Sequence, residues 1–266
     1  MVKSLKIFAK KYIKEKSPLM INYRICCRLV KKFLKVPDYT EEIIHWKSWL
    51  PKYWEEVSCP EAQERIFSKP LLNLINRLQD SGKVNLKLLE IGSGPASLLA
   101  WGVKANLFQV VAIDALADIY EEIMRGHNYS YVIKPIKGCG EKLFKIVDTE
   151  SFDIAYSSNA LDHVRFPQKC LKNMFKAVKR GGYVCLEGYV NEGFLRSFWG
   201  LHQHNLKPIN GHLFCADKNR KMVNLTKRIK QKCVCQEIVK AVERANGTPF
   251  VRNNDDRWFT IIFQKI

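Results

Sequence analysis

The chain carries one stretch in which an apolar run passes directly into two closely spaced glycines: Leu88-Leu89-Glu90-Ile91-Gly92-Ser93-Gly94-Pro95-Ala96-Ser97. The apolar residues extend back to Val84, which is typical of a buried strand. Glycines allow a tight turn and the close approach of a ligand to the backbone, and the start of a following helix presents unpaired N–H groups. The stretch therefore predicts a strand, a ligand-binding loop and a helix, in that order.

Similar apolar runs recur at helix-length intervals along the rest of the chain. The strand-like runs lie at residues 108–113, 152–156, 183–187, 233–239 and 258–264. A helix is predicted at residues 170–179, with Gly181 and Gly182 as its terminator. Strands that alternate with helices indicate a parallel sheet covered on both faces. We therefore expect an α/β fold with a doubly wound, mostly parallel sheet.

Two parts of the chain lie outside this alternation. Residues 1–80 space their apolar side chains as helices do, so we expect a helical extension or lid before a main domain at residues 81–266. Residues 188–222 show little periodicity and are rich in His, Asn and Gly. We expect them to form an insertion over the edge of the sheet.

The chain is strongly basic, with a formal net charge of +18. Residues 1–36 hold eleven Lys or Arg against one Glu, so this arm contributes more than half of the excess. Such a balance often marks nucleic-acid binding. Most of these cations are Lys, however, which suits a solvated helical face at least as well as base or phosphate recognition. A nucleic-acid partner is therefore the less favoured hypothesis.

The cysteines and the hydropathy pattern bear on the compartment. Nine cysteines are scattered along the chain, with no paired C-x-x-C motifs that would complete a zinc set, and this favours a reducing compartment. No window approaches the roughly 18 to 20 apolar residues that a membrane span needs. The amino terminus also lacks the apolar region of a signal peptide. We expect a soluble, cytoplasmic protein without a membrane span.

Two acidic residues discriminate between the cofactors that such a loop can bind. Glu90 lies two residues before the first glycine, and Asp114 ends the next strand, 20 residues after Gly94. In a dinucleotide site the second acid binds a ribose, and a third glycine packs under the pyrophosphate. Here Ser97 stands in place of that glycine, and a carboxylate at Glu90 suits a cationic amino-acid group better than a pyrophosphate. The pattern favours S-adenosylmethionine over a nicotinamide cofactor.

At this point the sequence resembles the class I S-adenosylmethionine-dependent methyltransferases, over about residues 84–187. The resemblance implies a Rossmann-like, seven-stranded sheet and an acid, Asp114, that holds the ribose hydroxyls. It also implies that the segment after the third strand borders the adenine, although Cys139 replaces the usual Asp there. The cofactor-binding residues implied are Glu90, Gly92, Gly94, Asp114, Ala115, Gly140, Glu141 and Asn159.

Four short motifs are similar to those of one bacterial subgroup of this family. They are Glu-x-x-x-Trp at residues 42–46, a segment like V-D-P-L-A-D-x-Y at 113–120, N-A-L-D-H at 159–163 and L-H-Q-x-N at 201–205. Ala115 replaces a Pro of the subgroup, and His204 replaces a Trp. The subgroup does not imply a single substrate, so the resemblance indicates the site and leaves the acceptor open.

Three residues are candidates for catalysis. Methyl transfer is an in-line displacement at a sulfonium carbon, so the protein mainly holds the acceptor in place and excludes water, while a His or carboxylate helps when the acceptor must lose a proton. Asp162 and His163 follow the fourth strand, where parallel sheets place ligands, and His202 lies in the insertion. As alternatives, Asp162 caps the next helix and His163 packs beside the adenosine.

Further polar and aromatic residues are candidates for acceptor binding, namely Trp46, Gln203 and Asn205. Aromatic residues at helical spacing are more often core, and Trp46 is favoured over its neighbours only by the subgroup motif. Glu187 either faces the same cleft or is solvated. The histidines within residues 202–212 match no zinc signature and have no Cys nearby, so we expect no metal.

These observations predict an enzyme that transfers a methyl group from S-adenosylmethionine to an O or N atom of a small molecule, a peptide or a sugar, in keeping with natural-product biosynthesis. The alternative is an RNA methyltransferase that holds its substrate with the basic arm. Against RNA, the segment after the fourth strand is N-A-L-D-H rather than the N-P-P-Y type that acts on nucleobase amino groups. A third hypothesis is a cofactor-binding protein that has lost catalysis.

Overall fold

The computed structural model describes residues 39–58, 67–219, 221–227, 229, 233–240 and 258–266. The chain divides into two units, residues 1–41 and 42–266, and the elements below belong to the second apart from the first two residues of helix α3. The predicted basic helix at residues 1–36 lies outside the described residues. No helix among the described residues has both the length and the apolar character needed to cross a membrane.

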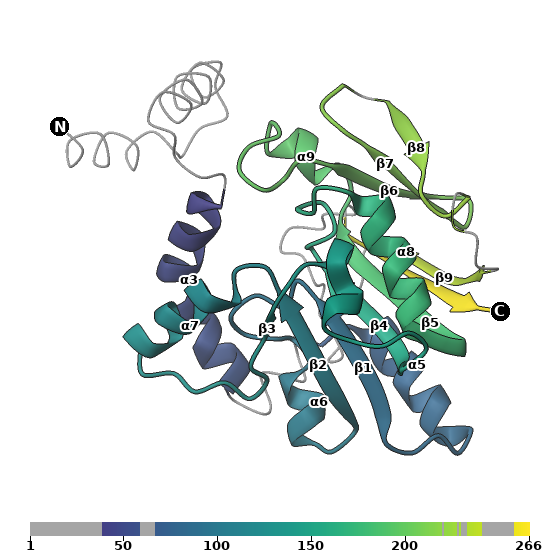
Figure 1. Cartoon of the computed structure of the whole chain (residues 1–266), viewed down its shortest axis with the longest axis horizontal. Helices are drawn as coiled ribbons and strands as arrows, with labels where there is room; N and C mark the ends of the chain where they lie inside the picture. Colours follow the sequence, from purple (N-terminus) through teal and green to yellow (C-terminus); the bar gives the residue numbers. More distant parts are fainter. Residues whose placement is uncertain (1–38, 59–66, 220, 228, 230–232, 241–257) are drawn as a thin grey trace. The chain divides into compact units, whose positions relative to one another are not determined.

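A seven-stranded sheet forms the centre of the second unit, in the order β3-β2-β1-β4-β5-β10-β9 (Figure 1). Its strands are β1 (Leu86–Ile91), β2 (Phe108–Asp114), β3 (Ile136–Lys137), β4 (Phe152–Ser158), β5 (Val178–Tyr189), β9 (Cys233–Lys240) and β10 (Trp258–Lys265). The first five in sheet order are parallel, and β10 pairs antiparallel with both β5 and β9. The doubly wound, mostly parallel, Rossmann-like sheet predicted from the sequence is confirmed.

The order of the strands reverses between β1 and β4. From β1 the chain continues outward to β2 and β3, whereas β4 returns to the other side of β1 and is followed by β5. Open α/β sheets bind ligands in the crevice at the carboxyl ends of the strands beside such a reversal. The ends of β1, β2 and β4 are therefore the expected place for a ligand.

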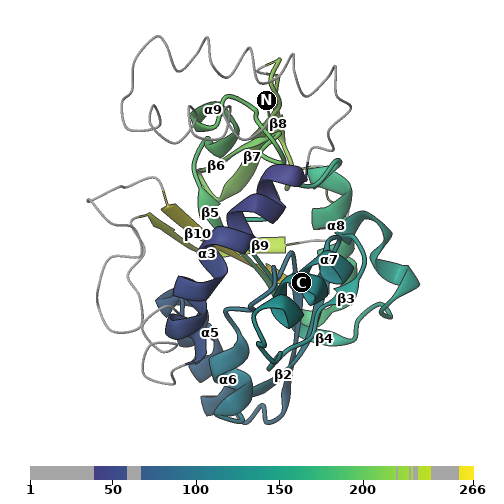
Figure 2. The same cartoon turned by 90° about the vertical axis from the view of Figure 1, so that its left-hand side faces the viewer.

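Helices cover both faces of the sheet. They are α3 (Thr40–Ser58), α5 (Lys69–Asp80), α6 (Ala100–Lys104), α7 (Ala117–Gly126), η1 (Gly140–Lys145, a 3-10 helix), α8 (Pro167–Ala177) and α9 (Glu192–Leu195). Alternate residues of β1 serve opposite faces: Leu88 packs into the core with α5 and α6, while Leu89 packs into the core with α8. Figures 1 and 2 show α5 and α8 on opposite sides of the sheet. Burial on both faces explains why the parallel strands are continuously apolar.

The glycine pair after α8 differs from the sequence prediction. We expected Gly181 and Gly182 to end a helix at residues 170–179, but α8 ends at Ala177 and both glycines lie inside β5. Gly181 has a φ of +73°, and the register between β4 and β5 shifts between Phe152 and Ile154. The glycines accommodate this irregularity in the pairing, as at a β-bulge, and the predicted terminator is wrong.

The insertion that follows β5 contains a second sheet. Its antiparallel strands are β6 (Asn205–Ile209), β7 (His212–Ala216) and β8 (Met222–Asn224). Asn210 and Gly211, both at positive φ, form a two-residue turn between the paired residues Ile209 and His212. Both views place this sheet beyond the carboxyl ends of the parallel strands (Figures 1 and 2). The insertion is thus more regular than its sequence suggested.

Candidate active site

The glycine loop, residues 92–94, follows the carboxyl end of β1. Gly92 and Gly94 have φ values of +74° and +64°, which side chains of L-residues rarely tolerate. The N–H of Gly92 donates to the carbonyl of Ile113 on β2 at 2.8 Å, and this bond holds the loop between two strand ends. The loop therefore presents its backbone at the point where the strand order reverses.

Asp114 fixes the other side of this loop. Its Oδ2 accepts a hydrogen bond from the N–H of Gly94 at 2.9 Å, and its Oδ1 accepts one from the N–H of Leu116 at 2.8 Å. Burial raises the pKa of Asp114, and the two backbone hydrogen bonds partly offset that effect. Ala115, between these residues, is exposed. The carboxylate thus holds the glycine loop and lies at the end of β2, where the resemblance expects a ribose ligand.

Glu90 is a buried carboxyl on β1, directly before the glycine loop. The hydroxyl of Ser97 donates to its Oε2 at 2.5 Å. Burial raises its pKa to about 7, although the Ser97 hydrogen bond acts in the opposite direction. Ser97, which stands where dinucleotide-binding loops have a third glycine, is therefore the partner of the acid that distinguishes this loop.

Helix α3 packs an aromatic cluster against the glycine loop. A Cβ built on Gly94 would lie 2.9 Å from Cζ2 of Trp46, so the indole covers this glycine. The indole Nε1 of Trp46 donates to Oε1 of Glu42 at 2.7 Å, and its ring also packs near those of Tyr53 and Tyr120. Trp46, predicted from sequence as an acceptor-binding residue, lies beside the glycine loop, and its contact with the acceptor stays a prediction.

The segment after β3 is held to helix α8. The carbonyl of Gly140 accepts a hydrogen bond from Nδ2 of Asn173 at 2.8 Å, and a Cβ built on Gly140 would lie 2.2 Å from Sγ of Cys170. Glu141 accepts a hydrogen bond from the N–H of Phe166 at 3.2 Å. Glycine is needed at position 140 because α8 approaches it so closely. Asn173 is a supporting residue that sequence reasoning missed.

The exit loop, residues 159–163, follows the carboxyl end of β4. Asn159 has a φ of +48°, and its N–H donates to the carbonyl of Glu187 at 2.9 Å. Its side-chain Oδ1 is buried and has no hydrogen-bond partner among the described residues. A buried acceptor without a donor is costly, which makes it a natural place for a ligand's N–H or O–H group.

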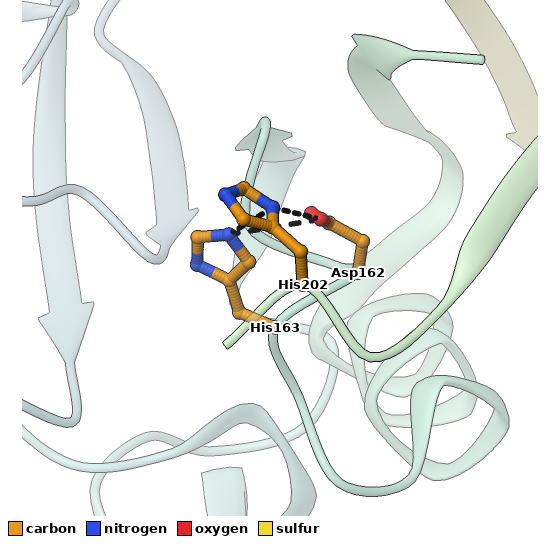
Figure 3. Close-up of side chains that lie close together, drawn as sticks. All are labelled: Asp162, His163 and His202. Atoms are coloured by element: carbon orange, nitrogen blue, oxygen red, sulfur yellow. Dashed lines mark hydrogen bonds and ion pairs between the residues drawn. The ribbon is translucent and has the colours of Figure 1, made fainter. Parts of the chain in front are cut away.

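Three of the predicted residues come together at this loop (Figure 3). Oδ2 of Asp162 lies 2.8 Å from Nδ1 of His202, and Nε2 of His163 lies 3.0 Å from the same Nδ1. Nε2 of His163 lies 3.6 Å from Oδ2 of Asp162. Burial of His202 favours its neutral form, but the hydrogen bond and the charge of Asp162 outweigh burial and raise its pKa. We call these three residues the Asp–His–His cluster.

The polar residues that follow His202 support the insertion. Nε2 of Gln203 donates to the carbonyls of Phe198 and Gly200, and Oδ1 of Asn205 accepts from the N–H of Phe194 at 2.7 Å. Both side chains therefore hold the loop that carries His202. Their contact with the acceptor stays a prediction.

Glu187 is neither solvated nor in a cleft. It is buried at the end of β5 and accepts hydrogen bonds from the hydroxyls of Ser68, Tyr156 and Thr260, at 2.8 Å from Tyr156 and 3.0 Å from Thr260. Burial raises its pKa, and these three donors oppose that effect. None of the donors was singled out from the sequence, because they lie on separate elements.

The residues around the glycine loop fit S-adenosylmethionine. A carboxylate oxygen can accept more than one hydrogen bond, so Asp114 retains capacity for ribose hydroxyls while it holds Gly94 and Leu116. Glu90 provides an acid near the place of a cationic amino-acid group, and Oδ1 of Asn159 provides an acceptor that has no donor among the described residues.

Comparison with known proteins agrees with this geometry. Residues 89–186 match the family model of a methyltransferase domain. No curated protein matches the chain.

Several solved structures are similar to the chain at low sequence identity. One is an S-adenosylmethionine-dependent methyltransferase from Thermotoga maritima (15% identity, 83% of this chain and 98% of that chain, TM-score 0.48). Another is a 1,6-didemethyltoxoflavin-N1-methyltransferase from Burkholderia thailandensis (10% identity, 85% of this chain and 86% of that chain, TM-score 0.46). The chain is also similar to the [4+2]-cyclase SpnF, with 17% sequence identity and a TM-score of 0.35; the alignment covers 45% of this chain and 45% of that chain.

The domain match covers the glycine loop, Asp114 and the exit loop, which are the parts that the sequence assigned to the cofactor and its methyl group. The match of residues 89–186 to a methyltransferase domain supports the conclusion that the chain is an enzyme and that it takes S-adenosylmethionine as its cofactor.

Proposed function

We propose that the enzyme transfers the methyl group to an oxygen or nitrogen atom of a small polar acceptor, namely a small molecule, a peptide natural product or a sugar. The convergence of Asp162, His163 and His202 at the carboxyl end of β4 carries this proposal. An acceptor hydroxyl or amine needs polar partners in a site that otherwise excludes water. The cluster offers one carboxylate and two imidazoles within reach of a single acceptor atom.

In this proposal one group of residues binds the cofactor and another binds the acceptor. Gly92, Gly94 and Asp114 hold the nucleoside, while Glu90 and Asn159 hold the amino-acid end of the cofactor. S-adenosylmethionine, when bound, supplies a methyl group on a positively charged sulfur. The Asp–His–His cluster holds the acceptor atom in line with that methyl group and favours loss of the acceptor's proton. The match to the bacterial subgroup with N-A-L-D-H remains part of this proposal.

RNA is the alternative acceptor. That hypothesis depends on the basic residues 1–36, which lie outside the described residues, so we keep it as an outcome of the test. The enzyme is incubated with methyl-labelled S-adenosylmethionine and a cell lysate, which is then separated into RNA, protein and small-molecule fractions. Label in the small-molecule or peptide fraction supports the proposal, and label confined to RNA contradicts it.

A matched pair of variants connects the transfer to the cluster. His202→Ala removes a cluster residue, and His212→Ala removes another histidine of the same insertion, on β7. We expect His202→Ala to lower transfer at least a hundredfold, while His212→Ala changes it less than threefold and both retain S-adenosylhomocysteine affinity. Equal activity of the two variants would show that the cluster has no part in transfer.

A further inference from the structure

We propose that Oδ2 of Asp162, Nε2 of His163 and Nδ1 of His202 bind a divalent transition-metal ion. Two imidazoles and one carboxylate converge from the exit loop and the insertion (Figure 3). The sequence led us to expect no metal, because the histidines within residues 202–212 match no zinc spacing. The ligands proposed here come instead from two segments: His202 lies 39 residues after His163 and 40 residues after Asp162.

The distances between the three atoms fit one ion. The sides of the triangle are 2.8, 3.0 and 3.6 Å. A point in its plane at equal distance from all three atoms lies about 1.9 Å from each, slightly less than the roughly 2.0–2.2 Å of zinc bonds to imidazole and carboxylate. An ion about 1 Å outside the plane therefore lies at ordinary bond lengths from all three atoms.

Hydrogen bonds alone do not give each of the three atoms in this triangle a partner of the right kind. Nδ1 of His202 carries either one proton or one lone pair in the plane of its ring, yet it faces both Asp162 and His163 at hydrogen-bond distance. One proton must then be shared between two acceptors, or one of the contacts lacks a proton. The carboxylate of Asp162 is only 4% exposed, so water contributes little. A cation satisfies all three atoms at once.

The backbone holds the two segments together before any ion binds. The N–H of Gln203 donates to the carbonyl of Asp162 at 3.2 Å, and the N–H of His202 donates to the carbonyl of Trp199 at 3.3 Å. Within the exit loop, the N–H of His163 donates to the carbonyl of Ala160 at 3.0 Å. These bonds fix the backbone on both sides of the triangle, so little ordering is left for metal binding to impose.

The ligand set indicates both the ion and its role. Imidazole and carboxylate ligands suit Zn²⁺, Fe²⁺, Co²⁺ and Mn²⁺, and a set of two histidines and one carboxylate leaves coordination positions open. This role rests on the proposed function. The acceptor's oxygen or nitrogen takes an open coordination position, where the charge of the ion lowers the pKa of the acceptor group and the acceptor's proton passes to solvent. The acceptor's electron pair then forms the new bond to the methyl carbon, while the carbon–sulfur bond breaks and the oxidation state of the ion does not change.

Metal binding is measured on the full, tag-free chain without any methyl transfer. The protein is treated with a chelator, dialysed and titrated with Co²⁺, Zn²⁺ or Mn²⁺ by calorimetry, and the Co²⁺ complex is examined by visible absorption. We expect one ion per chain and a Kd below about 10 µM for Zn²⁺ or Co²⁺. We also expect the visible absorption of the Co²⁺ complex to be that of four- or five-coordinate Co²⁺. Absence of stoichiometric binding by all three ions overturns the proposal.

Variants locate the ion and separate this proposal from the function. Asp162→Asn and His202→Ala should weaken binding more than tenfold, whereas Asp217→Asn and His212→Ala, on the same insertion, should leave it unchanged. Thermal unfolding and S-adenosylhomocysteine binding verify that each variant is folded, and His163→Ala gives a second test if His202→Ala unfolds. Unchanged binding in folded cluster variants overturns the site, whereas tight binding without transfer to any small acceptor overturns only the proposed function.

Discussion

A Cβ built on Gly92 would lie 2.2 Å from the Cβ of Ala160, so the glycine loop and the exit loop are in direct contact. Gly92 follows β1 and Ala160 follows β4, the two strands between which the order of the sheet reverses. The loop assigned to the cofactor and the loop assigned to the acceptor therefore fix each other's position. Their spacing follows from the positions of the two strand ends.

This contact predicts a difference between two glycine substitutions. Gly82 and Gly92 both have positive φ, +84° and +74°, but Gly82 has nothing within 4 Å of its added Cβ. Gly82→Ala should lower the free energy of unfolding by about 1–2 kcal/mol, from the backbone alone. Gly92→Ala should lower it by a further 1–3 kcal/mol or so through overpacking and weaken S-adenosylhomocysteine binding more than tenfold. Denaturant unfolding and calorimetry measure both; similar losses in the two variants would contradict the contact.

Replacement of Asp114 should separate cofactor binding from general folding. Asp114→Ala removes the acceptor of two backbone N–H groups, and we expect S-adenosylhomocysteine affinity to fall more than tenfold and unfolding free energy to fall by about 1–3 kcal/mol. Asp118→Ala, in the first turn of α7, removes an exposed ion pair with Lys137 and should change neither by much. Affinity that survives Asp114→Ala would remove Asp114 from the cofactor site.

Glu90 makes the stability of the cofactor-free enzyme depend on pH. Its pKa of about 7 lies above the ordinary value of 4.5, so the folded chain binds this proton more tightly than the unfolded chain. The stabilisation is complete below about pH 4.5 and is lost as the pH rises through about 7. Between about pH 5 and pH 8, the unfolding free energy of Glu90→Gln should therefore rise by about 2.5 kcal/mol relative to that of the wild type.

The control for this experiment is Glu121→Gln, which changes an exposed carboxylate paired with Lys134. Its difference from the wild type should stay nearly constant over the same pH range, because surface pairs contribute little. Parallel pH profiles for wild type and Glu90→Gln would show that Glu90 titrates normally.

The buried carboxylate of Glu187 predicts a stability effect at a distance from the cofactor. Tyr156→Phe removes the hydroxyl that donates to Oε2 of Glu187 at 2.8 Å. Because a buried acceptor that loses its donor is costly, we expect a loss of about 1–3 kcal/mol in unfolding free energy. Tyr183→Phe, on β5, is the matched change and should cost less than about 0.5 kcal/mol. Equal losses of unfolding free energy in the two variants would indicate that the hydrogen bond from Tyr156 to Glu187 does not contribute to stability.

Much of the fold could be predicted because it depends on local patterns. The strand before Gly92 and the acid at the end of β2 are both visible in short windows, and the alternation of strands and helices gives the sheet. The turn at Asn210-Gly211 was not predicted, although an Asn-Gly pair is typical of such turns, because the flanking strands are short and one contains Pro208. Gly181 misled us because a glycine pair serves a helix end and a strand irregularity equally well.

The candidate site was predictable only in part. Asp162, His163 and His202 were each selected, but nothing in their spacing indicates that Nδ1 of His202 lies 2.8 Å from Asp162. That distance depends on how the insertion returns over the sheet. The donors to Glu187 lie on different elements, and Trp46 reaches Gly94 from a helix that precedes the domain. Long-range packing of this kind has no counterpart in a short sequence window.

The second sheet has a consequence for protein engineering. Strands β6, β7 and β8 pair with one another in the named sheets. The chain leaves the main sheet at Tyr189, the end of β5, and rejoins it at Cys233 of β9, which pairs with Lys265 at the opposite end of β10. Leu206 of β6 and Leu213 of β7 are buried in the same core cluster as Leu89 of β1, so the second sheet is packed into the main domain. A chimera that exchanges this segment for that of another enzyme must therefore supply matching core side chains as well as a replacement for His202.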